Sequence, residues 1–203
     1  MKKFVALLTV FLMFASVLSA CSPSAPTADA TESTTTQESA VNTDLVIYND
    51  AAMLSKGPNG EVAVPINTLQ LTDDDIAKIK AGGFKAAIIS AGSGEWYGAI
   101  ERGAIAQCEA LGIEVVFTSE CNFDPAKQAT DVESSLALEP DILITLPVDP
   151  VSAAQALQPA VDAGVKIVFM DNGVDGYTPG EQYLAIVTGD QWGMGRAAAQ
   201  LVS

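Results

Sequence analysis

The sequence has no histidine, few basic residues and little charge overall. Without histidine it has no Ser-His-Asp or Cys-His nucleophile and no histidine-ligated metal, which argues against most hydrolase and zinc-site designs. Ten lysines and arginines stand against 25 acidic residues, and the formal net charge of −15 repels the phosphate backbone of nucleic acids. We therefore expect a protein that is not an enzyme, holds no metal or cofactor and does not bind nucleic acid.

Part of the apolar content lies at the start of the chain. A basic Met1-Lys2-Lys3 precedes an apolar run from Phe4 to Leu18, which is short for a membrane span and has the form of a secretory signal. The run ends in Leu18-Ser19-Ala20-Cys21, which resembles the lipobox of bacterial lipoproteins. This resemblance implies a lipoprotein signal peptide over residues 1–20, acylation of Cys21, and a lipid-anchored protein in the cell envelope, on the outer face of the cytoplasmic membrane or facing the periplasm. The alternative is a plain signal peptide with an incidental cysteine.

Two segments separate this signal from the regular part of the sequence. Residues 21–43 are mostly small, polar or acidic and have almost nothing to bury, so we predict a disordered tether. Residues 44–83 are predicted to be a pre-domain segment with one helix. That helix begins after the capping residue Thr72, carries Asp73 to Asp75 at its positive end, and stops at Gly82-Gly83.

Short apolar strands alternate with helical stretches in the remainder of the chain. The expected strands are 85–90, 114–118, 141–146, 166–170 and 184–188, and the expected helices are 96–111, 125–138, 150–163 and 191–202. Gly112 and Gly164 follow two helices as stops, and Pro125 and Pro150 suit first helical turns. The alternation predicts an α/β fold with a doubly wound parallel sheet, whose ligands bind beyond the carboxyl ends of the strands.

The first of these strand-to-helix loops suits a sugar better than a nucleotide. Gly92, Gly94 and Gly98 do not have the spacing of a dinucleotide fingerprint. Trp96 and Tyr97 follow at once, and an aromatic face packs well on the C–H face of a sugar ring. The alternative for one or both rings is packing into the helix that begins there.

Later loops add polar groups for sugar hydroxyls. Asp171 directly follows a buried strand and precedes Asn172 and a glycine, an arrangement that packing alone does not explain. Asp149 is a further candidate, but an aspartate before a proline such as Pro150 often caps a helix instead.

An ordered set of motifs carries a family resemblance. The motifs are Ser90 to Tyr97, Leu111-Gly112, Asp124-Pro125-Ala126-Lys127-Gln128, Leu146-Pro147-Val148-Asp149-Pro150, Ile167 to Asn172, and Thr188-Gly189-Asp190-Gln191 followed by Gly193 and Gly195. Together they resemble the type I periplasmic binding proteins, and most closely the ribose-binding-like sugar-binding lipoproteins of ABC importers. The resemblance covers about residues 84–203.

The resemblance implies two α/β lobes that close over a sugar about a hinge. Residues 84–189 would form the N-terminal lobe, and residues 190–203 would form the first helix of a second lobe. A chain of 203 residues is too short to complete that second lobe, so we expect a truncated chain. With Asp149 added for its place in a strand-to-helix loop, the candidate ligand-binding residues are Ser90, Glu95, Trp96, Tyr97, Asp149, Asp171 and Asn172. Asn172 stands where ribose binders have arginine, and Gly94-Glu95 where they have asparagine, so ribose itself is not indicated.

The implied function is capture of a monosaccharide and its delivery to the permease of an ABC importer, by a monomer. Because the ligand bridges both lobes in this family, we expect this chain alone to bind sugar weakly or not at all. Two alternatives stay open: a sugar-sensing module that feeds a membrane signalling protein, and glycoside hydrolysis by Asp149 and Asp171 as a carboxylate pair.

The remaining cysteines, Cys108 and Cys121, are not expected to pair. Cys108 lies late in a helix and Cys121 in a loop at the opposite edge of the sheet, so a disulfide between them is geometrically unfavourable. We expect Cys108 to be a buried free thiol, whereas a place at the border of the ligand cleft is one option for Cys121.

Overall fold

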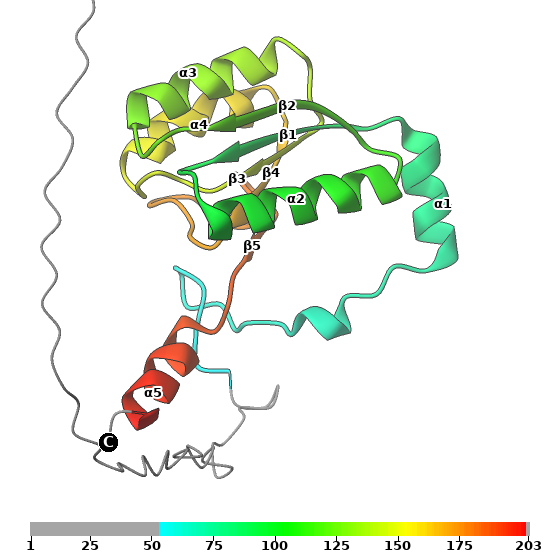
Figure 1. Cartoon of the computed structure of the whole chain (residues 1–203). Coiled ribbons are helices and arrows are strands. Elements are labelled where there is room, and N and C mark those ends of the chain that lie inside the picture. The colour runs from blue at the N-terminus through cyan, green and yellow to red at the C-terminus, as the bar shows by residue number, and fades with distance from the viewer. Residues whose placement is uncertain (1–52, 202–203) are drawn as a thin grey trace, which may run out of the picture. The chain divides into compact units, whose positions relative to one another are not determined.

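The computed structural model describes residues 53–201 (Figure 1). The predicted signal peptide, the predicted lipid-bearing Cys21, the predicted tether and the start of the predicted pre-domain segment lie outside the described residues. Within them, helices and strands alternate as the sequence predicts. The elements are η2 (Ile66–Thr68), α1 (Asp73–Gly82), β1 (Lys85–Ser90), α2 (Glu95–Ala110), β2 (Glu114–Glu120), α3 (Pro125–Leu136), β3 (Ile142–Thr145), α4 (Ser152–Asp162), β4 (Lys166–Met170), β5 (Ala185–Val187) and α5 (Gln191–Leu201).

The five strands form one parallel sheet in the order β2-β1-β3-β4-β5. Helix α2 covers one face, and α3 and α4 cover the other (Figure 1). The direction of strand addition reverses between β1 and β3, which is the switch point where doubly wound sheets bind their ligands. The predicted α/β, doubly wound parallel fold is confirmed.

The core lies on both faces of the central strands. Every residue of β1 after Lys85 is buried, which explains its continuous apolar sequence. One cluster, around Leu143, Leu157 and Phe169, fills the space beneath α3 and α4. A smaller cluster around Ile88 and Met170 faces α2. The strand ends, and therefore the loops at the carboxyl edge, are anchored by this packing.

Local signals set most helix ends as predicted. Thr72 and Asp75 form a reciprocal capping box at the start of α1, and Gly83 ends that helix with a φ of 63°. Pro125 occupies the first turn of α3, where its missing N–H costs nothing. The prediction that Pro150 lies in the first turn of a helix is wrong, because α4 begins only at Ser152.

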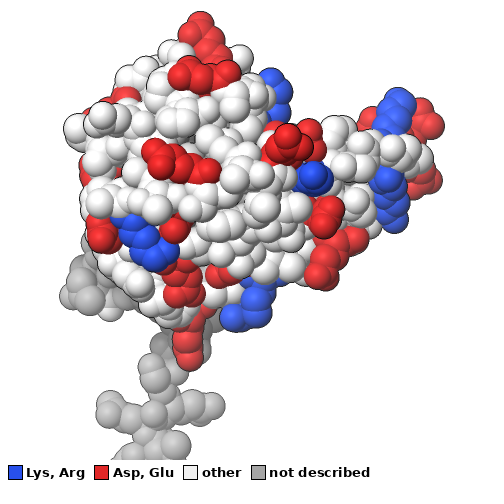
Figure 2. All heavy atoms as spheres, turned by 90° about the horizontal axis from the view of Figure 1, so that it is seen from above, with Lys and Arg blue, Asp and Glu red and all other residues white. Residues whose placement is uncertain are grey.

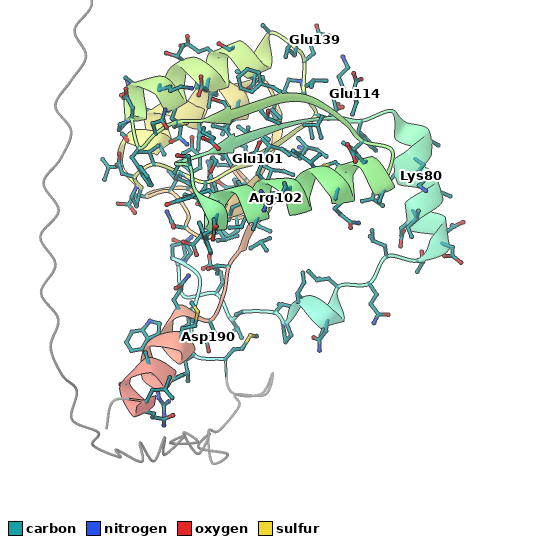
Figure 3. All side chains as sticks on the ribbon, viewed as in Figure 1. Lys80, Glu101, Arg102, Glu114, Glu139 and Asp190 are labelled. Atoms are coloured by element: carbon teal, nitrogen blue, oxygen red, sulfur yellow. The ribbon has the colours of Figure 1, made fainter. Side chains whose placement is uncertain are left out.

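Residues 53–71, which we call the strap, run ahead of α1. An antiparallel bridge between Lys56 and Val62 closes a hairpin in it. The hairpin is tied to the start of α5, beside which Asp190 lies (Figure 3). The Asp190 carboxylate accepts hydrogen bonds from the Ser55 hydroxyl at 2.7 Å and the Ser55 N–H at 3.0 Å. These bonds, chiefly the one from the Ser55 hydroxyl, lower the pKa of Asp190 to about 2.

In the view of Figure 2, charged side chains are scattered over the surface, and the basic ones do not gather into a patch. Acidic groups outnumber basic ones there, in line with the net charge of −15. Within residues 53–201 no helix is both long and apolar enough to cross a membrane.

Candidate functional site

The carboxyl edge of the sheet carries a pocket of about 270 Å³. It lies between the start of α2 and the ends of β4 and β5, and its lining consists of Trp96, Ile100, Met170, Asp171, Val187, Thr188 and Gly189. A hollow of about 60 Å³ at the amino ends of β4 and β5 includes none of the predicted site residues. The larger pocket is therefore the candidate site, and it brings together Trp96 and Asp171 from the predicted set.

Asp171 is held in an uncommon backbone conformation at the end of β4. Its φ is 67°, and the chain turns so tightly there that the Asn172 N–H donates to the Met170 carbonyl at 2.9 Å. Its own N–H donates to the Val187 carbonyl of β5 at 2.8 Å. The neighbouring strand thus fixes the residue with its side chain at the pocket.

Two side chains of the β5–α5 connection orient the Asp171 carboxylate. The Thr188 hydroxyl donates to Oδ1 at 3.0 Å, and the Gln191 amide donates to the same oxygen at 2.7 Å. Among the described residues, Oδ2 receives no such bond, so this oxygen is available to a ligand hydroxyl. The sequence motif contained both partners, but their role at Asp171 was not predicted.

The two predicted aromatic rings have different surroundings. Trp96 is 51% exposed and lines the pocket, whereas Tyr97 is half-buried and packs against the core cluster on the α2 face. The rings meet edge-on, with centroids 4.9 Å apart. The Tyr97 ring therefore packs with helix α2, as the alternative for these rings predicted, and it contacts the side of the Trp96 ring.

Four other predicted residues lie outside the lining of the pocket. Ser90 is buried, and its hydroxyl donates to the Gly92 carbonyl at 3.0 Å. Glu95 and Asn172 are exposed at the same edge. Asp149 holds the turn before α4: its Oδ1 accepts from the N–H groups of Val151 and Ser152 at 2.9 Å each, and its Oδ2 accepts from the Ser152 hydroxyl.

The bond from the Ser152 hydroxyl is the main reason that the pKa of Asp149 is lowered. Asp149 thus stabilises the turn that leads into α4, whose N-cap residue is Val151. Its carboxylate oxygens already have partners within the loop, so a ligand would have to compete with them.

Gln128 is a structural partner of the site that the sequence reasoning did not single out. Its side chain is fully buried beneath the β3–α4 loop. Its amide donates to the Leu146 carbonyl at 3.0 Å, and its Oε1 accepts from the Val148 N–H at 3.0 Å. Gln128 therefore holds both sides of Pro147 and, with them, the position of Asp149.

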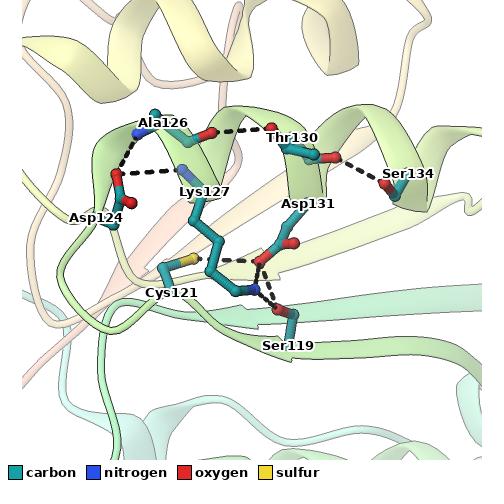
Figure 4. Close-up of polar contacts among 8 residues, drawn as sticks. All are labelled: Ser119, Cys121, Asp124, Ala126, Lys127, Thr130, Asp131 and Ser134. Atoms are coloured by element: carbon teal, nitrogen blue, oxygen red, sulfur yellow. Dashed lines mark hydrogen bonds and ion pairs between the residues drawn. The ribbon is translucent and has the colours of Figure 1, made fainter.

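A polar cluster joins β2 to α3 (Figure 4). The Asp131 carboxylate forms an ion pair with the Lys127 ammonium at 2.6 Å and accepts from the Ser119 hydroxyl, while the Cys121 thiol lies 3.7 Å from it. Burial raises the pKa of the Cys121 thiol to about 12, with a further contribution from the charge of Asp131. This cluster fixes α3 to the sheet and has no reactive thiolate.

The structure rules out the option that Cys121 borders the cleft. Its side chain is fully buried in the core cluster beneath α3, because the chain turns inward at this residue before α3 begins. Cys108 is also buried, as predicted, and both are free thiols. Among the described residues, no group of three or more cysteine or acidic side chains could hold a metal ion.

Comparisons with known proteins agree with the fold. Residues 84–203 match the periplasmic binding protein domain. A solute-binding protein of an ABC transporter from Agrobacterium vitis, solved with α-D-tagatopyranose, is 26% identical, has a TM-score of 0.52, and is matched over 58% of this chain and 42% of its own.

Two more distant structures share the fold. The Caulobacter myo-inositol binding protein is 21% identical, with a TM-score of 0.52 over 59% of this chain and 40% of its own. The arabinose-binding protein AraP from Geobacillus stearothermophilus is 19% identical, with the same TM-score over 59% of this chain and 40% of its own. No curated protein sequence matches the chain. The match over residues 84–203 covers more than half of the sequence, and with the Agrobacterium structure it shows that the chain belongs to the type I periplasmic binding proteins, a family of solute-binding proteins and not of enzymes.

Proposed function

We propose that this chain captures a monosaccharide at the carboxyl edge of its sheet, as part of a sugar-binding lipoprotein of an ABC importer. The observation that carries the proposal is the pocket in which an oriented carboxylate, Asp171, faces the same space as the exposed ring of Trp96. Its volume of about 270 Å³ is near the lower end for ligand pockets, which suits a small ligand.

The chemistry of the pocket suits a neutral polyol. A carboxylate oxygen accepts charge-assisted hydrogen bonds from hydroxyl groups, and the face of an indole packs on the C–H groups of a sugar ring. We assign these two contacts to Asp171 and Trp96. Asn172 adds an exposed amide beside them, and the tagatopyranose of the Agrobacterium relative supports a sugar as the ligand class.

The remaining residues of the predicted site have lesser roles in this proposal. Glu95 is exposed at the same edge of the sheet as the pocket. Asp149 contacts the sugar when a sugar hydroxyl replaces one of its hydrogen bonds within the loop. Ser90 and Tyr97 support the wall from within. The side chains that discriminate among sugars include those of a second lobe, so the proposal stops at the monosaccharide class.

The placement in the cell envelope is part of the same proposal. Residues 1–20 act as a lipoprotein signal, Cys21 carries the lipid, and residues 21–43 tether the folded part to the membrane. Residues 84–189 form the N-terminal lobe of a monomeric binding protein, and residues 190–203 start the second lobe. Closure of the two lobes over the sugar creates the form that the permease recognises.

The proposal predicts weak sugar binding by the 203-residue chain, because these residues form the pocket but span only 42% of the length of the Agrobacterium relative, and we propose that further contacts come from a second lobe. Titration calorimetry and saturation-transfer NMR with D-tagatose, myo-inositol and L-arabinose should show dissociation constants in the millimolar range. Asp171→Ala and Trp96→Ala should abolish the signal. Asp175→Ala, which removes a nearby exposed carboxylate, should leave it unchanged. Unaltered binding by Asp171→Ala would refute the assigned site, and micromolar binding by the chain would refute the two-lobe mechanism.

Lipid attachment has its own test. Cells expressing the chain and fed an alkyne-tagged fatty acid should label the wild-type protein and not Cys21→Ser. Equal labelling of both would show that Cys21 is not the acylated residue.

A further inference from the structure

The β2–α3 loop, residues 121–124, presents a phenylalanine that no assigned role explains. The loop is anchored at both ends, by the fully buried Cys121 side chain and by Asp124, whose carboxylate caps α3 through the Ala126 N–H at 2.9 Å. Between these anchors the Phe123 N–H donates to the Ala91 carbonyl at 2.7 Å. The backbone around Phe123 is therefore held against the β1–α2 loop.

The backbone conformation of this loop is costly. Asn122 and Phe123 both have positive φ angles, of 52° and 58°. Asparagine tolerates the left-handed region, but for a bulky residue such as phenylalanine it is an outlier. Strained conformations of this kind persist where the surrounding structure imposes them, and they concentrate at functional sites.

The ring of Phe123 is not used to fill the core. Its side chain is 57% exposed, and it rests edge-on against Tyr97, with centroids 5.6 Å apart. It also lies over Gly92, where an added Cβ would meet the ring at 2.4 Å. Since Tyr97 also contacts Trp96, which lines the pocket, the three rings form a continuous aromatic row that begins at the pocket.

We propose that Phe123 is a ligand-contact residue, which extends the apolar wall begun by Trp96 so that the C–H face of a bound sugar packs along the aromatic row. This inference rests on the proposed function. Three observations support it: the strained backbone, the glycine that leaves space for the ring, and the exposure of a large apolar side chain at the ligand edge of the sheet.

The aromatic ring signals of the 203-residue chain, titrated with D-tagatose and with myo-inositol in NMR, test the inference. The signals of Phe123 and Trp96 should move together along one saturation curve. Phe84, an exposed phenylalanine before β1 at the opposite edge of the sheet, is the matched control and should not move. Movement of Trp96 without Phe123 would overturn the inference and leave the proposed function standing. If no signal moved with either sugar, the proposed site and the inference would both fail for these ligands.

Substitutions separate ligand contact from structural packing. Phe123→Leu, which keeps an apolar side chain but removes the ring, should weaken sugar binding about two- to tenfold, and Phe84→Leu should not change it. Phe123→Gly relieves the positive φ, so its thermal midpoint should match or exceed that of the wild type while its affinity falls. A lower midpoint with unchanged affinity would show that the ring serves the loop and not a ligand.

Discussion

The buried amide of Gln128 offers the sharpest test of how this edge of the sheet is built. Replacement Gln128→Ala removes the two hydrogen bonds that hold the Leu146 carbonyl and the Val148 N–H on either side of Pro147. Each buried backbone group left without a partner costs about 1–3 kcal/mol, and the lost side-chain volume adds to this. Removing the side chain also removes the free-energy cost of burying its polar amide, which offsets part of this loss. We therefore expect the free energy of unfolding to fall by about 3 kcal/mol.

Urea denaturation, followed by far-ultraviolet circular dichroism and tryptophan fluorescence, measures this change. Gln155→Ala is the matched control, because Gln155 is exposed on α4, and its effect should stay within about 0.5 kcal/mol. Gln128→Leu restores most of the volume without the hydrogen bonds, so it should remain destabilised. A loss below about 1 kcal/mol in Gln128→Ala would refute the argument, because the loop would then be held by other contacts.

A carboxyl group at the same position adds a pH test. In Gln128→Glu the new side chain can accept from Val148, but it can donate to Leu146 only when protonated. Burial raises the pKa of such a group above its unfolded value, so the native state binds a proton that the unfolded state has released. The variant should therefore be most stable at acidic pH and lose stability as the pH rises through the raised pKa. A pH-independent deficit would contradict the buried position.

Three further predictions follow from local geometry. The carboxyl of Asp190 should titrate in NMR with a pKa of about 2. The hydrogen bonds between Asp190 and the strap are therefore intact above pH 3.8, the ordinary pKa, and are lost as the pH falls toward 2. Ser55→Ala should move the pKa of Asp190 upward toward 3.8. Gly112→Ala, at a φ of 70°, should destabilise the chain by about 1–2 kcal/mol in urea denaturation, whereas Gly103→Ala within α2, where a Cβ meets nothing, should stabilise it by about 0.5–1 kcal/mol. Cys121, with a pKa raised to about 12, should resist alkylation in the folded chain and react on unfolding, as peptide mass spectrometry would show.

The fold could be predicted because its signals are local. Continuous apolar runs mark strands buried on both faces, and a residue such as Gly83, with a φ of 63°, marks a helix end wherever it occurs. The start of α4 was misplaced because Pro150 suits both a first helical turn and the turn that precedes one. The carboxylate of Asp149 decides between them by accepting hydrogen bonds from the N–H groups of Val151 and Ser152.

The site was predicted less completely, because its geometry depends on strand register. Asp171 was identifiable as a charge directly after a buried strand, but its partners lie 17 and 20 residues further on. Met170 pairs with Val187, and only this register sets Thr188 and Gln191 beside Asp171. Phe123 was missed because nothing in the sequence distinguishes an exposed phenylalanine from a buried one.

The strap was the least predictable part. Ser55 and Asp190 are separated by 135 positions, and no periodicity or motif connects them. Short polar residues that bond across such distances are set by the folded arrangement itself, so a sequence pattern cannot identify them.

The polar groups beneath the carboxyl edge bear on how binding would work. Gln128 holds the β3–α4 loop, Asp124 caps the helix after the β2–α3 loop, and Gln191 orients Asp171, in each case through hydrogen bonds within the protein. A sugar that binds here does not have to order these loops, so little of its interaction energy is lost to local ordering. Under the proposed two-lobe mechanism, the conformational change that reports ligand occupancy then comes from the approach of the second lobe and not from this edge. Variants such as Gln128→Ala, which loosen this edge, should for the same reason lower the affinity for sugar, as titration calorimetry would show.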